Sequence, residues 1–261
     1  MAIELAFSDA GAGPPLVILH GLFGSGRNWA SVARALARDR RVLRVDMRNH
    51  GRSPWDPVHD YPALAADVAR LIGAHCGGRA DLLGHSMGGK AAMVLALAQP
   101  ALVRGLVVVD IPPGPSGDGP RDALRAMRGV DLARLSRRAE VETALAREVA
   151  DPAVRSFLAL NAESGPAGLS WSVNLDAVER HIDAITGFPP QSPESRFSGP
   201  TLFVLGGRST FVGPQHRAEI ARLFPRAQVT VVPAAGHWVH AEAPGAFVDV
   251  VREFLTACPR A

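Results

Sequence analysis

The stretch Gly84-His85-Ser86-Met87-Gly88 has the form Gly-x-Ser-x-Gly and lies between a predicted strand and a predicted helix. The apolar run that ends at Leu83 is typical of a strand, and the alanine-rich run from Lys90 to Ala98 is typical of a helix. Such a sharp turn requires small residues on both sides, because the backbone passes close to its neighbours and holds the serine in a strained conformation. We therefore predict that Ser86 is a nucleophile raised above the edge of a sheet. An ordinary glycine-containing loop is the alternative, and the flanking strand and helix argue against it.

The rest of the 261-residue chain predicts a mostly parallel, doubly wound sheet. Short apolar runs alternate with segments whose apolar residues have helical spacing. The first strand is expected at the edge of the sheet, where Ile3, Leu5 and Phe7 alternate with polar or small residues, and a Gly/Pro turn follows at 9–15. The other expected strands cover residues 16–19, 42–46, 80–83, 106–109, 200–205 and 228–232.

This alternation stops after Pro112, and no strand-like apolar run is visible before residue 196. A Gly/Pro-rich segment, 114–120, is followed by stretches with helical character at 141–149, 153–161 and 175–185. We therefore expect a core made of residues 1–113 and 196–261. A helical cap, residues 114–195, is expected to be inserted after the strand that ends at Asp110.

A serine hydroxyl is a weak nucleophile unless a base takes its proton, and a histidine held by a carboxylate usually serves as that base. His237 follows the last predicted strand, in a loop after Ala235-Gly236, and we predict that it is the base. His240 is expected on the first turn of the final helix, where a packing or surface role is the stronger interpretation.

The carboxylate of the predicted site is usually found in the loop after the strand that follows the insertion, and here it is either missing or supplied from elsewhere in the chain. Ser209 occupies that loop, and no carboxylate occurs between Glu194 and Glu219. Asp110 ends the strand that follows the helix after Ser86, at the same edge of the parallel sheet as Ser86 itself. We predict that Asp110 orients His237, with a turn cap before Pro112 as the alternative. On this interpretation Asp110→Asn removes most of the activity, whereas Ser209→Ala costs little.

An oxyanion hole needs two backbone N–H groups that point at the developing negative charge. Met87, directly after the nucleophile, and Leu22, in the glycine-rich loop after the first buried strand, are the predicted donors. Phe23, Trp171 and Trp238 are candidates for an acyl pocket, although aromatic residues commonly belong to the core instead.

Composition excludes several other classes of protein. The net charge of +3 comes from scattered basic residues, so a nucleic-acid partner is not expected. No metal-ligand or phosphate-loop spacing is present, and we expect no metal and no cofactor. No apolar run is long enough to span a membrane, the N-terminus does not resemble a signal peptide, and Cys76 and Cys258 lack metal-ligand spacing. These features favour a cytoplasmic protein, and we expect a monomer or a small homo-oligomer.

Lys90 is the only lysine among 28 lysine and arginine residues, and it lies four residues after Ser86. A neutral position on the surface is the preferred interpretation. A role in packing or positioning the elbow is the alternative.

Several of these motifs together resemble one subgroup of serine esterases with the α/β-hydrolase fold, which includes the bacterial esterase YbfF and the mitochondrial abhydrolase domain-containing protein 11. The similar stretches run from about residue 14 to the C-terminus and are His20-Gly21-Leu22-Phe23-Gly24-Ser25, Asp46-Met47-Arg48-Asn49-His50-Gly51-Arg52-Ser53, Gly84-His85-Ser86-Met87-Gly88-Gly89-Lys90-Ala91-Ala92-Met93, Val108-Val109-Asp110-Ile111 and Gly236-His237-Trp238-Val239-His240. The resemblance implies a cofactor-free esterase acting on short to medium acyl esters, with acyl thioesters as a further substrate class. It also implies that Ser86, Asp110 and His237 form the triad.

Two alternatives to an esterase remain open at this point. A carbon–carbon bond hydrolase or a cofactor-free perhydrolase would use the same Ser-His-Asp set on the same fold. A binding protein that keeps the fold without catalysis belongs to a different class, and the intact elbow, base and oxyanion loop argue against it.

Overall fold

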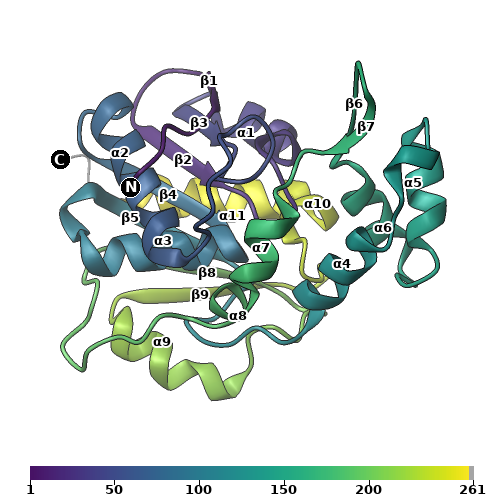
Figure 1. The fold of residues 1–261 in the computed structure, drawn as a ribbon. Coiled ribbons are helices and arrows are strands. Elements are labelled where there is room, and N and C mark those ends of the chain that lie inside the picture. The colour runs from purple at the N-terminus through teal and green to yellow at the C-terminus, as the bar shows by residue number, and fades with distance from the viewer. Residues whose placement is uncertain (259–261) are drawn as a thin grey trace.

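The computed structural model describes residues 1–258, and a seven-stranded sheet forms its centre (Figure 1). The strand order is β1-β3-β2-β4-β5-β8-β9. β1 runs antiparallel to β3, and the other neighbouring pairs are parallel. The strands are β1 (Phe7–Ala10), β2 (Pro15–Leu19), β3 (Arg41–Val45), β4 (Ala80–His85), β5 (Val103–Val109), β8 (Thr201–Gly206) and β9 (Ala227–Val232). Because parallel strands end at the same edge, the residues that follow β4, β5 and β8 lie near one another.

Helices cover both faces of the sheet, as the alternation of apolar runs predicts. α1 (Ala30–Leu36) and α11 (Pro244–Ala257) pack on one face, and α2 (Tyr61–His75), α3 (Met87–Ala98) and α9 (Arg217–Leu223) pack on the other. In β2 the side chains of Leu16 and Ile18 pack on the face covered by α1 and α11. Those of Val17 and Leu19 pack on the opposite face, which α2, α3 and α9 cover. A strand buried on both faces reads as a continuous apolar run, which is why β2 was recognisable in the sequence.

The predicted first strand is wrong in position. β1 begins at Phe7 and runs to Ala10, so it occupies part of the stretch predicted as a turn. Ile3 and Leu5 lie outside the ladder, where Leu5 is buried and the Ile3 N–H donates to the Asp67 carboxylate at 2.7 Å. Their alternation therefore reflects packing of the N-terminal segment beside α2 and not strand pairing.

The insertion, residues 114–195, contains a β-hairpin that the sequence reading missed. Its strands are β6 (Ala162–Gly165) and β7 (Gly168–Trp171), a short antiparallel pair with few apolar residues. The Gly/Pro-rich segment is also shorter than expected, because a helix begins at Gly119 with Pro120 in its first turn, where proline is tolerated. The helices are α4 (Gly119–Arg128), α5 (Arg138–Leu145), α6 (Pro152–Ala159), α7 (Leu175–Arg180) and α8 (Ile182–Thr186). In Figure 1, α4, α5, α6 and the β6–β7 hairpin, teal to green, lie to the right of the sheet, whereas α7 and α8 overlap it in this view.

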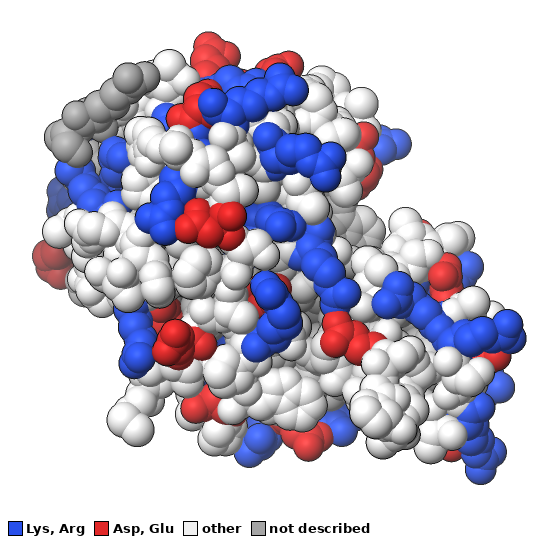
Figure 2. Space-filling view, turned by 90° about the horizontal axis from the view of Figure 1, so that it is seen from above, with Lys and Arg blue, Asp and Glu red and all other residues white. Residues whose placement is uncertain are grey.

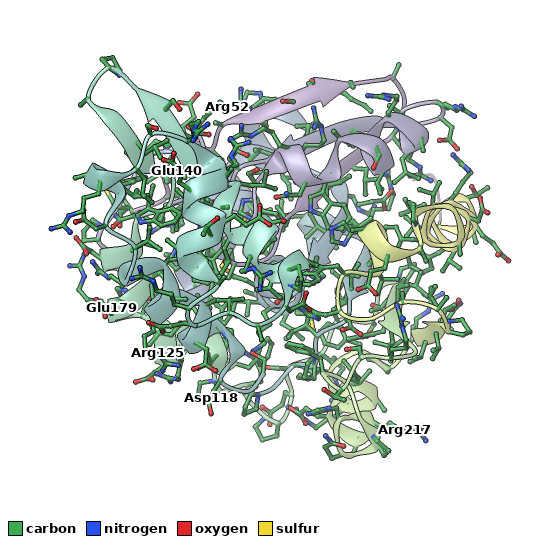
Figure 3. The ribbon with its side chains drawn as sticks, turned by 90° about the vertical axis from the view of Figure 1, so that its right-hand side faces the viewer. Arg52, Asp118, Arg125, Glu140, Glu179 and Arg217 are labelled. Atoms are coloured by element: carbon green, nitrogen blue, oxygen red, sulfur yellow. The ribbon has the colours of Figure 1, made fainter. Side chains whose placement is uncertain are left out.

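Charged side chains are spread over the surface. Figure 2 shows basic and acidic residues interspersed on the face that it presents. In Figure 3, Asp118, Arg125 and Glu179 lie at the outside of the insertion, and all three are exposed. Within residues 1–258, no helix combines the length and the apolar character that a membrane crossing requires.

Candidate active site

Ser86 lies at a strained turn between β4 and α3. Its φ of 50° and ψ of −118° are unusual for a residue with a side chain, and such strain is typical of functional sites. Its N–H donates to the Val109 carbonyl at 3.1 Å, which ties the turn to the end of β5. A Cβ atom on Gly88 would lie 2.5 Å from the Leu19 carbonyl oxygen, so only glycine permits this close approach. The predicted strand–turn–helix arrangement is therefore present.

His237 and Asp110 meet behind this turn. His237 Nδ1 lies 2.8 Å from Asp110 Oδ2, and the Asp110 side chain is almost fully buried. The other carboxylate oxygen, Oδ1, accepts from the Gly206 N–H at 3.0 Å. Asp110 itself has a φ of 49°, a second strained position at the same sheet edge. The structure thus brings the predicted acid and base into contact.

Ser209, which stands where the acid is usually found in the sequence, contacts the carboxylate of Asp110. Its hydroxyl donates to Asp110 Oδ2, the oxygen that also faces His237 Nδ1. Three donors therefore surround the two oxygens of Asp110 and fix the orientation of its carboxylate.

The Ser209→Ala variant is therefore expected to lose more activity than the small loss that the sequence predicts. Removing one hydrogen bond to a charged group is expected to lower kcat by about three- to tenfold, with little change in KM. Steady-state hydrolysis of p-nitrophenyl butyrate measures this, and Ser209→Thr, which keeps a hydroxyl, serves as the matched control. Equal rates for Ser209→Ala and the wild type would show that the contact does not support the carboxylate.

Two neighbouring rings fix the position of His237. Phe211 stacks on the imidazole with ring centroids 3.8 Å apart. The His85 Nε2–H donates to the His237 carbonyl oxygen at 3.0 Å. Burial, together with the nearby His237 and His240, holds the pKa of His85 well below its usual value, so His85 is a neutral donor. The sequence reading overlooked His85, although it is the variable residue of the Gly-x-Ser-x-Gly motif.

The backbone N–H groups of Leu22 and Met87, the predicted oxyanion donors, differ from their neighbour in having no backbone or side-chain acceptor within residues 1–258. The next amide along the loop, that of Phe23, is occupied, because it donates to His50 Nε2 at 3.2 Å. Phe23 has a φ of 61°, and its carbonyl accepts from Asn161 Nδ2 of the insertion at 2.8 Å. The loop is therefore held from the core by His50 and from the insertion by Asn161.

Two buried neutral histidines, His20 and His50, hold this loop against the core through hydrogen bonds. His20 Nδ1–H donates to the Gly21 carbonyl at 2.8 Å, and His20 Nε2 accepts from the Met47 N–H at 2.9 Å. His50 Nδ1–H likewise donates to the Arg48 carbonyl at 2.9 Å. Burial lowers the pKa of both histidines, which keeps one nitrogen of each ring free to accept.

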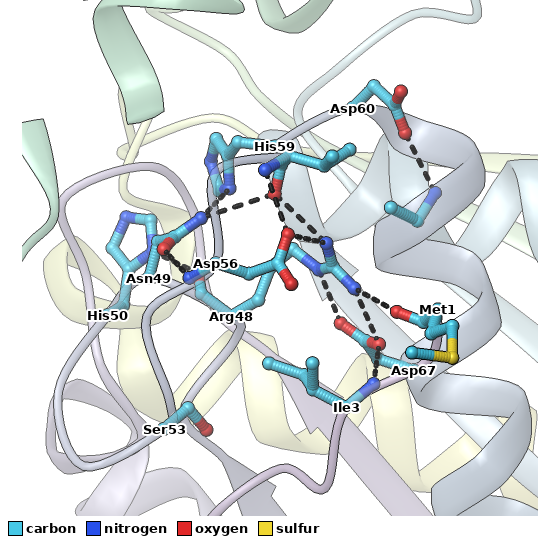
Figure 4. Close-up of polar contacts among 12 residues, drawn as sticks. Met1, Ile3, Arg48, Asn49, His50, Ser53, Asp56, His59, Asp60 and Asp67 are labelled. Atoms are coloured by element: carbon cyan, nitrogen blue, oxygen red, sulfur yellow. Dashed lines mark hydrogen bonds and ion pairs between the residues drawn. The ribbon is translucent and has the colours of Figure 1, made fainter. Parts of the chain in front are cut away.

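Arg48 anchors the segment that carries His50. Its guanidinium donates to both oxygens of Asp67 on α2, at 2.6 and 2.8 Å, and to the Val58 carbonyl at 2.9 Å (Figure 4). The adjacent Asn49 has a φ of 64° and accepts from the Asp56 N–H at 2.8 Å. The motif Arg48-Asn49-His50 therefore acts structurally, since it presents His50 to the loop of Leu22 and Phe23.

A cavity of about 260 Å³ opens over Ser86 and His237. Residues from the core loops and from α4 and α6 line it: His20, Gly21, Leu22, Phe23, Gly24, Asn28, Trp29, His85, Ser86, Gly119, Pro120, Ala123, Val154, Phe157, Leu158, Phe211, His237, Trp238 and His240. Phe23 and Trp238 thus reach the cavity, as the sequence suggests. Trp171 is not among the lining residues, so its pocket assignment is corrected, and it lies instead in β7 opposite Ala162, where it packs against the core.

His240 lies in a separate short helix, α10 (Val239–Glu242), and not on the final helix as expected. Its buried ring stacks on Trp29 with centroids 3.9 Å apart, which agrees with a packing role. Burial also lowers its pKa to about 3. Among residues 1–258, no group of three or more His, Cys, Asp or Glu side chains is arranged to hold a metal ion.

Lys90 is not on the surface, and the preferred interpretation of its position is wrong. Its side chain is completely buried, four residues along α3 from the nucleophile. Sequence position alone could not show this burial, because the groups that surround Nζ come from residues 116, 186 and 187.

Comparison with known proteins places these features in context. The sequence matches the protein family described as alpha/beta hydrolase fold over residues 14–244. It is 44% identical over 250 residues to sn-1-specific diacylglycerol lipase ABHD11 of Mus musculus, a match that covers 93% of this chain and 81% of the relative. It is 35% identical over 242 residues to esterase YbfF of Escherichia coli (strain K12), covering 92% of each chain. A solved structure named marine microorganism esterase superimposes with a TM-score of 0.93 at 35% identity, covering 97% of this chain and 100% of that chain.

Proposed function

The chain belongs to the α/β-hydrolase fold family and is an ester hydrolase, and from this premise we propose that Ser86, His237 and Asp110 act together as its catalytic triad. The contact between His237 Nδ1 and Asp110 Oδ2, at the sheet edge where Ser86 is exposed to the same cavity, carries this proposal. The relatives named as esterases and lipases support the reaction class.

In the proposed acylation step, His237 takes the proton from the Ser86 hydroxyl through Nε2, and the serine oxygen attacks the ester carbonyl. Asp110 holds Nδ1 protonated and stabilises the imidazolium that forms. The imidazolium then gives its proton to the departing alcohol, which leaves an acyl group on Ser86. A water molecule repeats the sequence and releases the acid.

The negative charge on the tetrahedral intermediate is assigned to the N–H groups of Leu22 and Met87. A single donor of this kind typically contributes about 3 kcal/mol to transition-state stabilisation. The support for this assignment is that neither group has another acceptor within residues 1–258, whereas the Phe23 N–H is already bonded to His50.

We assign the insertion the role of a cap, because α4 and α6 supply the apolar wall opposite the catalytic loops. Pro120 and Ala123 come from α4, and Val154, Phe157 and Leu158 come from α6. The proposed substrates are short to medium acyl esters, with acyl thioesters as a second class, and no cofactor takes part.

A neutral acyl group is expected to be strongly preferred over an anionic one. Of the residues that the structure describes, no lysine, arginine, aspartate or glutamate lines the cavity, and burial lowers the pKa values of His20, His85 and His240. Bringing a carboxylate into such surroundings without a partner is costly. The ratio of kcat/KM for p-nitrophenyl butyrate to that for the p-nitrophenyl monoester of succinate is therefore expected to exceed about 100. A ratio near one would contradict the proposed neutral pocket.

The function itself is tested with a substrate panel in the presence of EDTA. Turnover of p-nitrophenyl acetate and butyrate, and of a butyryl thioester, is the expected result. If no ester or thioester is turned over and a carbon–carbon bond substrate is cleaved instead, the esterase proposal is wrong. Absence of all turnover, with retained ligand binding, would favour the non-catalytic alternative.

A further inference from the structure

The single lysine of the chain occupies a buried position that the triad does not explain. Lys90 lies in the first turn of α3, and its N–H donates to the Ser86 carbonyl at 3.0 Å. Its side chain is completely buried and runs away from the solvent. Placing an ammonium group there requires partners, because an unpaired buried cation is strongly unfavourable.

The partners come from the two segments that join the insertion to the core. Lys90 Nζ donates to Ser116 Oγ at 3.1 Å, on the segment that leads into the insertion. It also donates to the carbonyls of Thr186 and Gly187, at 3.0 and 2.6 Å, on the segment that leads out. Ser116 and Thr186 are bonded to each other as well, because the Ser116 N–H donates to the Thr186 carbonyl at 2.9 Å. All three hydrogens of the ammonium group thus point at the insertion.

No carboxylate within the described part of the chain neutralises this cation. Among the ion pairs of residues 1–258, none includes Lys90. The Tyr61 ring lies 5.9 Å from Nζ, and its hydroxyl donates to the Ile185 carbonyl at 2.7 Å, beside the same segment. The site is therefore made of neutral dipoles and one aromatic face, which hold the ammonium by geometry and not by opposite charge.

We propose that Lys90 is a positioning residue that fastens both ends of the insertion to α3. It thereby sets the distance between Ser86 and the apolar cavity wall formed by α4 and α6. The segment that contains Ser116 leads directly into α4, whose residues Gly119, Pro120 and Ala123 line the cavity. A shift of this segment would move that wall, whereas the sheet edge that carries Ser86 and Asp110 would stay in place.

The Lys90→Met variant tests this directly, because methionine keeps most of the volume and removes all three donors. KM for p-nitrophenyl octanoate, whose chain reaches the wall, is expected to rise about tenfold, and kcat for the acetate to change less than about threefold. Amide hydrogen exchange in segments 114–118 and 184–188 is expected to become at least about tenfold faster. The KM measurement rests on the proposed function, whereas hydrogen exchange does not. Failure of the esterase proposal would therefore remove only the kinetic effect, and failure of the Lys90 proposal would remove the change in exchange.

The matched control is Arg155→Met. Arg155 is also a cation bonded to two backbone carbonyls, those of Val149 and Ala150 at 2.9 and 2.8 Å, but all three residues belong to the insertion. The Arg155→Met variant is expected to leave amide hydrogen exchange in segments 114–118 and 184–188 unchanged. Lys90→Gln, which keeps two donors, is expected to recover part of the octanoate KM. Wild-type exchange and a wild-type octanoate-to-acetate ratio in Lys90→Met would overturn the proposal.

The wild-type protein provides a test that needs no variant. Because Lys90 is the only lysine, labelling with [¹³Cε]lysine gives a single side-chain signal without assignment. Burial lowers the pKa of Lys90 to about 7, so this signal is expected to titrate far below the ordinary lysine value of about 10.4. A midpoint near 10.4, together with side-chain motion as free as that of an exposed lysine, would show a solvated side chain and would exclude the proposed fastening.

The same shift gives stability a defined pH dependence. Between pH of about 7 and about 10.4, unfolded Lys90 binds a proton that folded Lys90 has lost, so the free energy of unfolding rises with pH. Other charged or titratable groups near the site are Tyr61 on α2, His216, whose pKa is lowered by burial and by Lys90, and Arg121 with Asp183 beside Thr186. These groups are shared with Lys90→Met, so the difference between the two proteins isolates Lys90. Parallel stability curves would contradict the burial of an ionisable amine.

Discussion

The Ser86→Ala variant is expected to hydrolyse p-nitrophenyl butyrate at least about 10⁴-fold more slowly than the wild type, because no other group can form the acyl-enzyme. The remaining groups, His237, Asp110 and the two N–H donors, stay in place, since the backbone strain at position 86 is imposed by β4, β5 and α3. The loss should therefore appear in kcat, with KM little changed. Initial rates at saturating substrate, corrected for spontaneous ester hydrolysis, measure it.

A matched control separates this loss from misfolding. Ser192 carries a hydroxyl that lies 3.1 Å from the Ser195 hydroxyl and stands outside the cavity lining, so Ser192→Ala should retain nearly all of the activity on the butyrate ester. Circular dichroism and thermal unfolding of both variants should resemble those of the wild type. Substantial turnover by folded Ser86→Ala would mean that another group is the nucleophile.

The Asp110→Asn variant is expected to lower kcat by about 10³- to 10⁴-fold, through the tautomer of His237. The Gly206 N–H donates to Oδ1, so the asparagine carbonyl oxygen is held there and the NH₂ group takes the position of Oδ2. That NH₂ group then faces His237 Nδ1, which must accept and so places the ring proton on Nε2. An Nε2 that already carries a proton cannot take the proton of Ser86.

Two measurements check this account of Asp110. A pH–rate profile should show the loss at every pH where the wild type is active, because the NH₂ group imposes the unproductive tautomer wherever the His237 ring is neutral. ¹⁵N spectra of the His237 side chain should show the ring proton on Nε2 in the variant and on Nδ1 in the wild type. Nearly full activity in Asp110→Asn, with a large loss in Ser209→Ala, would mean that the acid is wrongly assigned.

Much of this site could be predicted because its signals are local in the sequence. The Gly-x-Ser-x-Gly turn is defined within five residues, and the buried parallel strands read as continuous apolar runs. The absence of a carboxylate between Glu194 and Glu219 directed attention to Asp110, which the structure brings into contact with His237. In each case the constraint acts through neighbours along the chain.

The features that escaped prediction depend on contacts between distant segments. Lys90 is buried because residues 116, 186 and 187 fold back over α3, and no local pattern reveals this. Asn161 reaches Phe23 across 138 positions in sequence, and His50 reaches it across 27. The sequence predicts that losing the Ser209 hydroxyl costs little, whereas the structure shows this hydroxyl donating to the Asp110 carboxylate.

The most direct test of the catalytic account is intact-protein mass spectrometry after brief incubation with a fluorophosphonate that carries a short alkyl chain. The account predicts one adduct per wild-type chain, mapped by peptide sequencing to Ser86, absent from Ser86→Ala and formed much more slowly by Asp110→Asn. An unlabelled wild type, or an adduct that persists in Ser86→Ala, would contradict it.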